Sequence, residues 1–116
     1  MNHGNMNKTL KALHDMLLAR HTELSQKLGG ITDPDKAQTI IMKMQEILHR
    51  IDLVQNLLFR QSSQQLDATL ADITQANDVL AKSIQSITDI GAFLTATANF
   101  LKYADEAIDI AKTLAA

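Results

Sequence analysis

The chain has 116 residues and a net charge of −2, so it can form one domain with a modest core and lacks the basic surplus that binds nucleic acid. Its hydrophobic content of 46% and mean hydropathy of −0.06 argue against both a membrane protein and a disordered chain. The absence of cysteine excludes disulfides, thiol nucleophiles and Cys-ligated metal, and the aromatic content of 3% favours a helical core of Leu, Ile, Met and Ala.

Residues 1–6 are polar, and we expect them to form a flexible N-terminus before a single domain over 7–116. A first helix is predicted over 7–28, where leucines recur at helical spacing: Leu10, Leu13, Leu17, Leu24 and Leu28. Gly29 and Gly30 favour its end, because glycine readily takes the left-handed conformation at a helix C-terminus.

His14 and His21 lie on one side of this helix, at the edge of the leucine stripe. Their spacing is too long for one zinc ion to be held by a single helix, where i, i+4 is the usual arrangement. We therefore expect no metal and no other cofactor. Both histidines are expected either within an interface or flanking one, and in an interface their titration near neutral pH would make association pH-sensitive.

A second helix is predicted over 34–61. Thr32 and Asp33 are candidate N-caps, and Pro34 fits the first turn, where its missing N–H is tolerated. The short linker favours an antiparallel hairpin with the first helix.

This second helix is apolar on more than one side. Its main apolar stripe comprises Ile40, Met44, Ile47, Ile51, Val54 and Leu58. Ile41, Leu48 and Phe59 widen this stripe. Met42, Leu53 and Leu57 lie roughly opposite to that stripe. Such a helix is either the central member of a bundle or the contact to a second chain.

A turn is expected at 61–65, where Ser62 and Gln65 fit a capping box. The steps of four and three residues that follow predict one long helix over 64–115; they fall on Leu66, Leu70, Ile73, Asn77, Leu80, Ile84, Ile87, Gly91, Leu94, Ala98 and Leu101. A bend or break near 89–91 is the alternative. Asn77 is polar on this apolar seam, where such a residue can fix register or the number of partners.

A second apolar seam beginning at Ile90 predicts that the last segment contacts at least two other helices. Asp105 and Asp109 share a helical face, a spacing that suits a carboxylate pair, although we expect them to belong to a solvated face.

No phosphate loop, nucleophile elbow or catalytic triad pattern occurs, so an enzyme is not expected. The sequence predicts an all-α antiparallel bundle of three to four helices with a long C-terminal coiled-coil-like helix, forming a homodimer.

The favoured function is a small non-catalytic protein–protein interaction module in the cytoplasm, with an unknown protein partner and neither nucleic acid nor membrane. Bacterial adaptors, chaperones and antitoxin or immunity proteins share this general build. The candidate interaction surface comprises Met42, Leu53, Leu57, Asn77, His14 and His21. The alternative is a membrane-active toxin or translocator component that exposes the segment 90–101.

Overall fold

The computed structural model describes residues 5–116 and confirms the all-α bundle with a long C-terminal helix. Most of the predicted flexible N-terminus, residues 1–4, lies outside the described residues. The helices are α1 (Lys8–Leu28), α2 (Pro34–Gln55), α3 (Gln64–Asp67), α4 (Leu70–Gln85) and α5 (Ile90–Lys112).

Local signals explain where the first two helices begin. Asn7 caps α1 by accepting a hydrogen bond from the Leu10 amide, and Asp33 caps α2 by accepting from the Asp35 amide. Pro34 opens α2 as predicted. α1 ends before Gly29 as predicted, but the glycine does not take the left-handed conformation that was expected to end the helix. Gly29 has φ −60° and ψ −23°, which is right-handed helical backbone.

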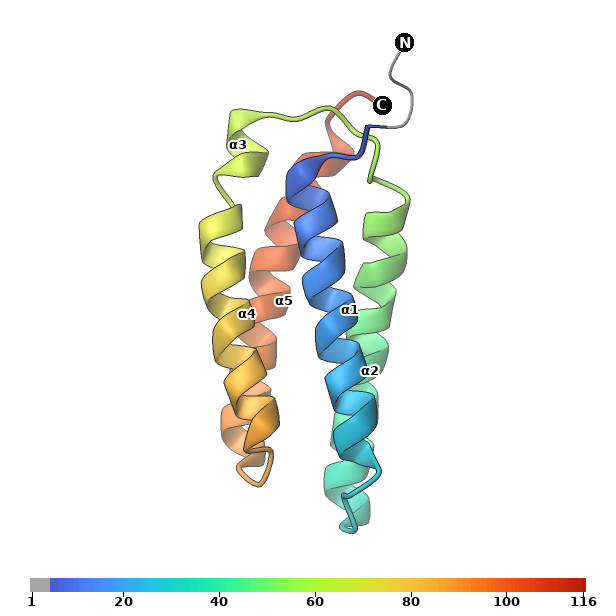
Figure 1. Ribbon diagram of the computed structural model, residues 1–116, viewed down its shortest axis with the longest axis vertical. Coiled ribbons are helices and arrows are strands. Elements are labelled where there is room, and N and C mark those ends of the chain that lie inside the picture. The colour runs from blue at the N-terminus through green and yellow to red at the C-terminus, as the bar shows by residue number, and fades with distance from the viewer. Residues whose placement is uncertain (1–4) are drawn as a thin grey trace.

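The bundle is built from two antiparallel hairpins, α1–α2 and α4–α5, packed side by side (Figure 1). α1 lies beside α4 and α2 lies beside α5, and each of these pairs runs in the same direction. The chain therefore crosses diagonally from α2 to α4, over the end of the bundle where the C-terminus also lies. This crossing comprises residues 56–69 and carries α3.

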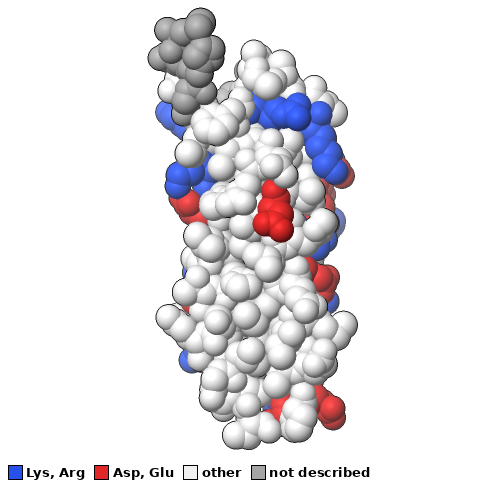
Figure 2. Space-filling view, turned by 90° about the vertical axis from the view of Figure 1, so that its right-hand side faces the viewer, with Lys and Arg blue, Asp and Glu red and all other residues white. Residues whose placement is uncertain are grey.

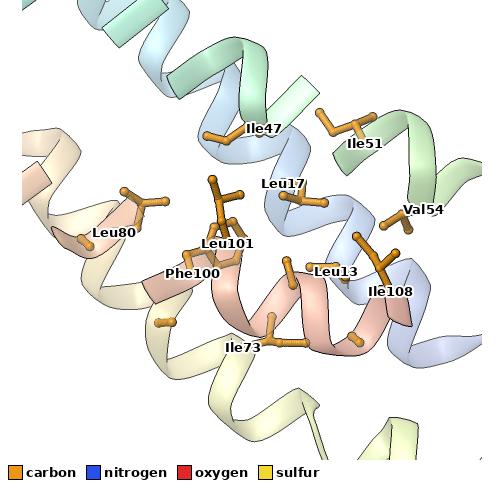
Figure 3. Close-up of a cluster of buried hydrophobic side chains, with 14 of the residues drawn as sticks. Leu13, Leu17, Ile47, Ile51, Val54, Ile73, Leu80, Phe100, Leu101 and Ile108 are labelled. Atoms are coloured by element: carbon orange, nitrogen blue, oxygen red, sulfur yellow. The ribbon is translucent and has the colours of Figure 1, made fainter. Parts of the chain in front are cut away.

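All four long helices contribute to one core (Figure 3). Leucines of α1 meet isoleucines of α2 and α4, and Phe93 and Phe100 of α5 fill the space between them without any exposure. The two seams of the last segment are accounted for by the contacts that α5 makes with both α4 and α2. Burial of these side chains is the main source of stability.

The predicted continuous helix over 64–115 is wrong: the alternative of a break near 89–91 holds to within a few residues, and a second break, at 68–69, was not predicted. Residues 68–69 separate α3 from α4, and residues 86–89 separate α4 from α5. Asp89 caps α5 by accepting from the Ala92 amide, while Ile87 remains buried inside the turn. The heptad steps continue through the break because the turn itself supplies a core residue.

α2 is six residues shorter than predicted, since it ends at Gln55 and not at Gln61. The turn that follows directs Leu57 into the core. The predicted capping box is displaced by one residue, because Ser63, not Ser62, accepts from the Leu66 amide to cap α3.

Asn7 and Arg60 tie the crossing segment to the ends of α1 and α5. The Asn7 side-chain amide donates to the Arg60 and Gln61 carbonyl oxygens at 3.1 and 3.2 Å. The Arg60 guanidinium donates to the Leu114 carbonyl at 2.6 Å, and the Gln61 amide donates to the Ala115 carbonyl at 2.7 Å. These bonds hold the crossing at a fixed position on the bundle.

Candidate interaction surface

The three α2-side residues of the predicted surface do not form one exposed patch. Met42 is exposed and Leu53 is half-buried against the core. Leu57 belongs to the core, because α2 has ended before it and helical spacing no longer places it opposite the main stripe. Its prediction as a surface residue is therefore wrong.

Asn77 is also buried, with 8% of its surface exposed. Its side-chain oxygen accepts a hydrogen bond from the Arg20 guanidinium at 2.8 Å, which links α4 to α1. Arg20 in turn pairs with Glu23 on its own helix, Nε to Oε1, at 2.9 Å. Asn77 therefore lies at a contact inside the bundle and not on an exposed surface.

His14 and His21 lie at the margin of the packed side of α1 and are half-buried. The Nε2 atom of His14 is buried and has no hydrogen-bond partner among residues 5–116. Within the same part of the chain, no three His, Asp or Glu side chains are grouped so that they could hold a metal ion. His49 is exposed on α2.

The side of α1 and α2 that faces away from the second hairpin carries two exposed leucines. Leu18 lies two residues before Arg20, whose side chain reaches α4. Leu48 lies two residues before Arg50, whose side chain reaches α5. Since each residue turns a helix by roughly 100°, both leucines lie almost opposite these contacts and share one outer face. They are 47% and 46% exposed.

Helical geometry aligns apolar and histidine side chains in rows across this face. Leu18 lies ten residues before the end of α1 at Leu28, and Met44 lies ten residues after the start of α2 at Pro34. Because α1 ends and α2 begins at the same end of the bundle (Figure 1), this count places His14 near the level of Leu48 and His21 near that of Ile41. We define the α1–α2 face as these six residues: His14, Leu18, His21, Ile41, Met44 and Leu48.

Few charged residues lie near the α1–α2 face, and the nearest on α2 is the exposed Asp52, which follows Leu48 by four residues and therefore lies on the same side of the helix. Figure 2 shows this side of the molecule: charged side chains lie at the top and along the margins, one carboxylate lies near the middle of the upper half, and most of the lower half carries no charge. One marginal pair is Lys11 and Asp15, 2.8 Å apart, in which the ammonium group lowers the pKa of the exposed Asp15 carboxyl.

The groove between α2 and α5 has the opposite character. Charged residues make up most of its lining, namely Lys43, Glu46, Arg50, Lys102, Asp105, Glu106 and Asp109. Arg50 and Asp105 form a bidentate pair with both hydrogen bonds at 3.0 Å, and the hydrogen bond to Asp105 raises the pKa of Arg50. The Asp105–Asp109 group is thus partly used in joining the two hairpins.

Sequence reasoning reached part of the α1–α2 face. The two histidines were assigned to an interface, and Ile41 and Leu48 were recognised as widening the apolar stripe of α2. Leu18 was missed, although it follows His14 by four residues and precedes His21 by three. That spacing places all three side chains on one side of α1.

The segment 90–101 forms the first half of α5, and its bulkiest side chains, Phe93 and Phe100, are fully buried. No helix within residues 5–116 is both long and apolar enough to cross a membrane. Comparison of the chain with protein-family models, with curated proteins and with solved structures gave no match.

Proposed function

We propose that this protein is a small non-catalytic protein–protein interaction module in the cytoplasm, which binds its partner through the α1–α2 face. The observation that carries the proposal is the exposure of Leu18 and Leu48, nearly half of each residue, on the outer face that α1 and α2 share. Contiguous apolar surface of this kind typically marks a contact site.

The contrast between faces supports the choice of surface. The groove between α2 and α5 is lined by seven charged side chains, four of which form the pairs Lys43–Glu46 and Arg50–Asp105. A partner that docks there has to displace water from all seven, which costs free energy unless the others are paired as well. On the α1–α2 face the central side chains are leucine, isoleucine and methionine, with histidines beside them. Burying this face therefore costs less desolvation.

Affinity capture from the native host tests the proposal. The wild-type chain should retain a specific protein that the Leu18→Glu/Leu48→Glu variant loses, since each substitution buries a carboxylate in an apolar contact. Val79→Glu is the matched control, because Val79 is 53% exposed but lies on α4. Equal capture by the wild type and the double variant would contradict the proposal.

Membrane activity through the segment 90–101 is the competing proposal. It requires α5 to leave the bundle, because Phe93 and Phe100 are fully buried in the core. Flotation with anionic liposomes separates the two functions. Association of the protein with vesicles, accompanied by exposure of α5 to protease, would favour the membrane-active reading over the interaction module.

A further inference from the structure

We infer that the partner on the α1–α2 face is a second copy of this chain, related by a two-fold axis. The inference rests on the proposed function, because it names the occupant of the same surface. Charge, size and the arrangement of the rows each favour a second copy.

Charge is the first argument. A two-fold interface brings the same patch together from both subunits, so every charged group at its centre would meet a like charge nearby. The α1–α2 face carries no Lys, Arg, Asp or Glu among its six residues. These six residues can therefore meet their own copy without repulsion, while Asp52, four residues after Leu48 on the same side of α2, brings one carboxylate per subunit to the edge of the contact. A partner of strong charge would find no opposite charge on these residues to pair with.

Size is the second argument. The bundle measures 52 Å along its length and 18 Å across the side drawn in Figure 2, so the whole of this side, with the charged residues in its upper part, offers at most 52 Å by 18 Å, or about 900 Å². Stable complexes bury about 800 Å² on each partner. A second copy of equal length covers the whole side, whereas a single peptide helix about 10 Å wide covers roughly half of its width.

The rows of side chains across the α1–α2 face can pack against those of a second copy with the two-fold axis either along the helices or across them. With the axis along the helices, α1 meets the partner's α2, and Leu18 lies opposite the partner's Met44. With the axis across the helices at the Leu18 row, α1 meets the partner's α1, and the row of His14 lies opposite the partner's His21. In both cases facing helices are antiparallel and apolar rows meet.

Light scattering after size-exclusion chromatography tests the inference on the full chain. At about 50 µM, above the micromolar Kd that an interface of this size reaches, the wild type should have twice the 12.8 kDa mass of one chain. Leu18→Glu/Leu48→Glu and Leu18→Lys/Leu48→Lys should each be monomeric, with helical circular dichroism unchanged. Val79→Glu should remain dimeric.

A mixture of the glutamate variant and the lysine variant tests most directly whether this face forms the dimer. Glutamates on one subunit then face lysines on the other, and the dimer mass should return in the mixture and fall again at high salt. Two charge variants also protect the test from a failure of either one to fold.

Two results would overturn the inference. A wild-type chain that stays monomeric at this concentration rules out the second copy. In that case the proposed function still stands if the face captures another protein. A dimer that survives both charge variants rules out this face as its interface.

Discussion

Asn7 makes more contacts with other parts of the chain than its position before the first helix would suggest. Its side chain caps α1 and donates to two carbonyl oxygens of the crossing segment, and its backbone amide donates to the Leu58 carbonyl at 2.6 Å. Asn7 is 3% exposed, so water cannot replace these bonds. One residue thus fixes both the start of α1 and the path from α2 to α4.

Asn7→Ala should lower the free energy of unfolding by about 2–3 kcal/mol, because it removes the cap and leaves two carbonyl oxygens without their donor. Asn7→Ser keeps a capping oxygen and should lose about half as much. Ser63→Ala, which removes only the cap of α3, is the control and should cost about 1 kcal/mol or less. Urea unfolding at one protein concentration measures all three. Equal losses for Asn7→Ala and Ser63→Ala would contradict this role of Asn7.

Sequence reasoning worked for residues whose role is local. The Asp33-Pro34 pair marks the start of α2 correctly because both the cap and the proline act within one turn. The carbonyl contacts of Asn7 could not be predicted, since they join residues more than fifty positions apart. No pattern within the chain signals them.

At the scale of elements, the turn at 86–89 shows the limit of heptad analysis. The apolar steps run from Ile84 through Ile87 to Gly91 without a change of phase, and both isoleucines are buried. Periodicity reports which residues are inside, but it does not report whether the chain reverses between them. The available signal was Asp89, which caps α5.

Substitutions at the end of this turn and in the first turn of α5 should change the free energy of unfolding in opposite directions. Asp89→Ala should lower the free energy of unfolding by about 1 kcal/mol, because the Ala92 amide loses its acceptor. Gly91→Ala should raise it by about 0.5 kcal/mol, since alanine favours helix and its Cβ would meet Asp89 Oδ1 at an ordinary 3.5 Å. Thermal unfolding distinguishes the signs. An increase in the free energy of unfolding for Asp89→Ala would contradict this, and would indicate that α4 and α5 are more stable when joined into one helix.

The contact between α1 and α4 depends on a polar pair. Asn77→Leu should destabilise the bundle by about 1–2 kcal/mol, because the Arg20 guanidinium, which is largely buried, loses its acceptor on α4 and keeps only Glu23 on its own helix. The double variant Arg20→Leu/Asn77→Leu should recover about half of this loss, since it leaves no buried guanidinium without an acceptor, while Glu23, the other partner of Arg20, is 35% exposed and can be hydrated. A double-mutant cycle measures this coupling. Additive losses would show that the pair does not act as a unit.

At the scale of the whole molecule, the sequence predicts the fold class but not the arrangement of the hairpins. Stripes on α1 and α2 predict an antiparallel hairpin, and the short linker enforces it. The crossing over 56–69 is long enough to reach either neighbouring or diagonal positions, so its length does not decide the topology. Contacts such as Arg50 with Asp105 and Arg20 with Asn77 identify the neighbours.

The α1–α2 face was only partly predictable for the same reason. Which side of an amphipathic helix remains free depends on where the other helices pack, and that depends on the hairpin arrangement. Met42 and Leu48 are similarly exposed on α2, but Leu48 adjoins the exposed Leu18 side of α1, whereas Met42 lies beside charged Glu46 and Arg50. Sequence alone does not make this distinction.

The claim that the α1–α2 face contacts a protein can be tested most directly by photo-cross-linking in the native host. A benzophenone amino acid replaces Leu18 in one variant and Val79 in a control variant of matched exposure. Illumination should give a discrete adduct at position 18, at twice the mass of the chain if a second copy is bound, and none at position 79. No adduct at position 18, or the same adducts at both positions, would contradict the account.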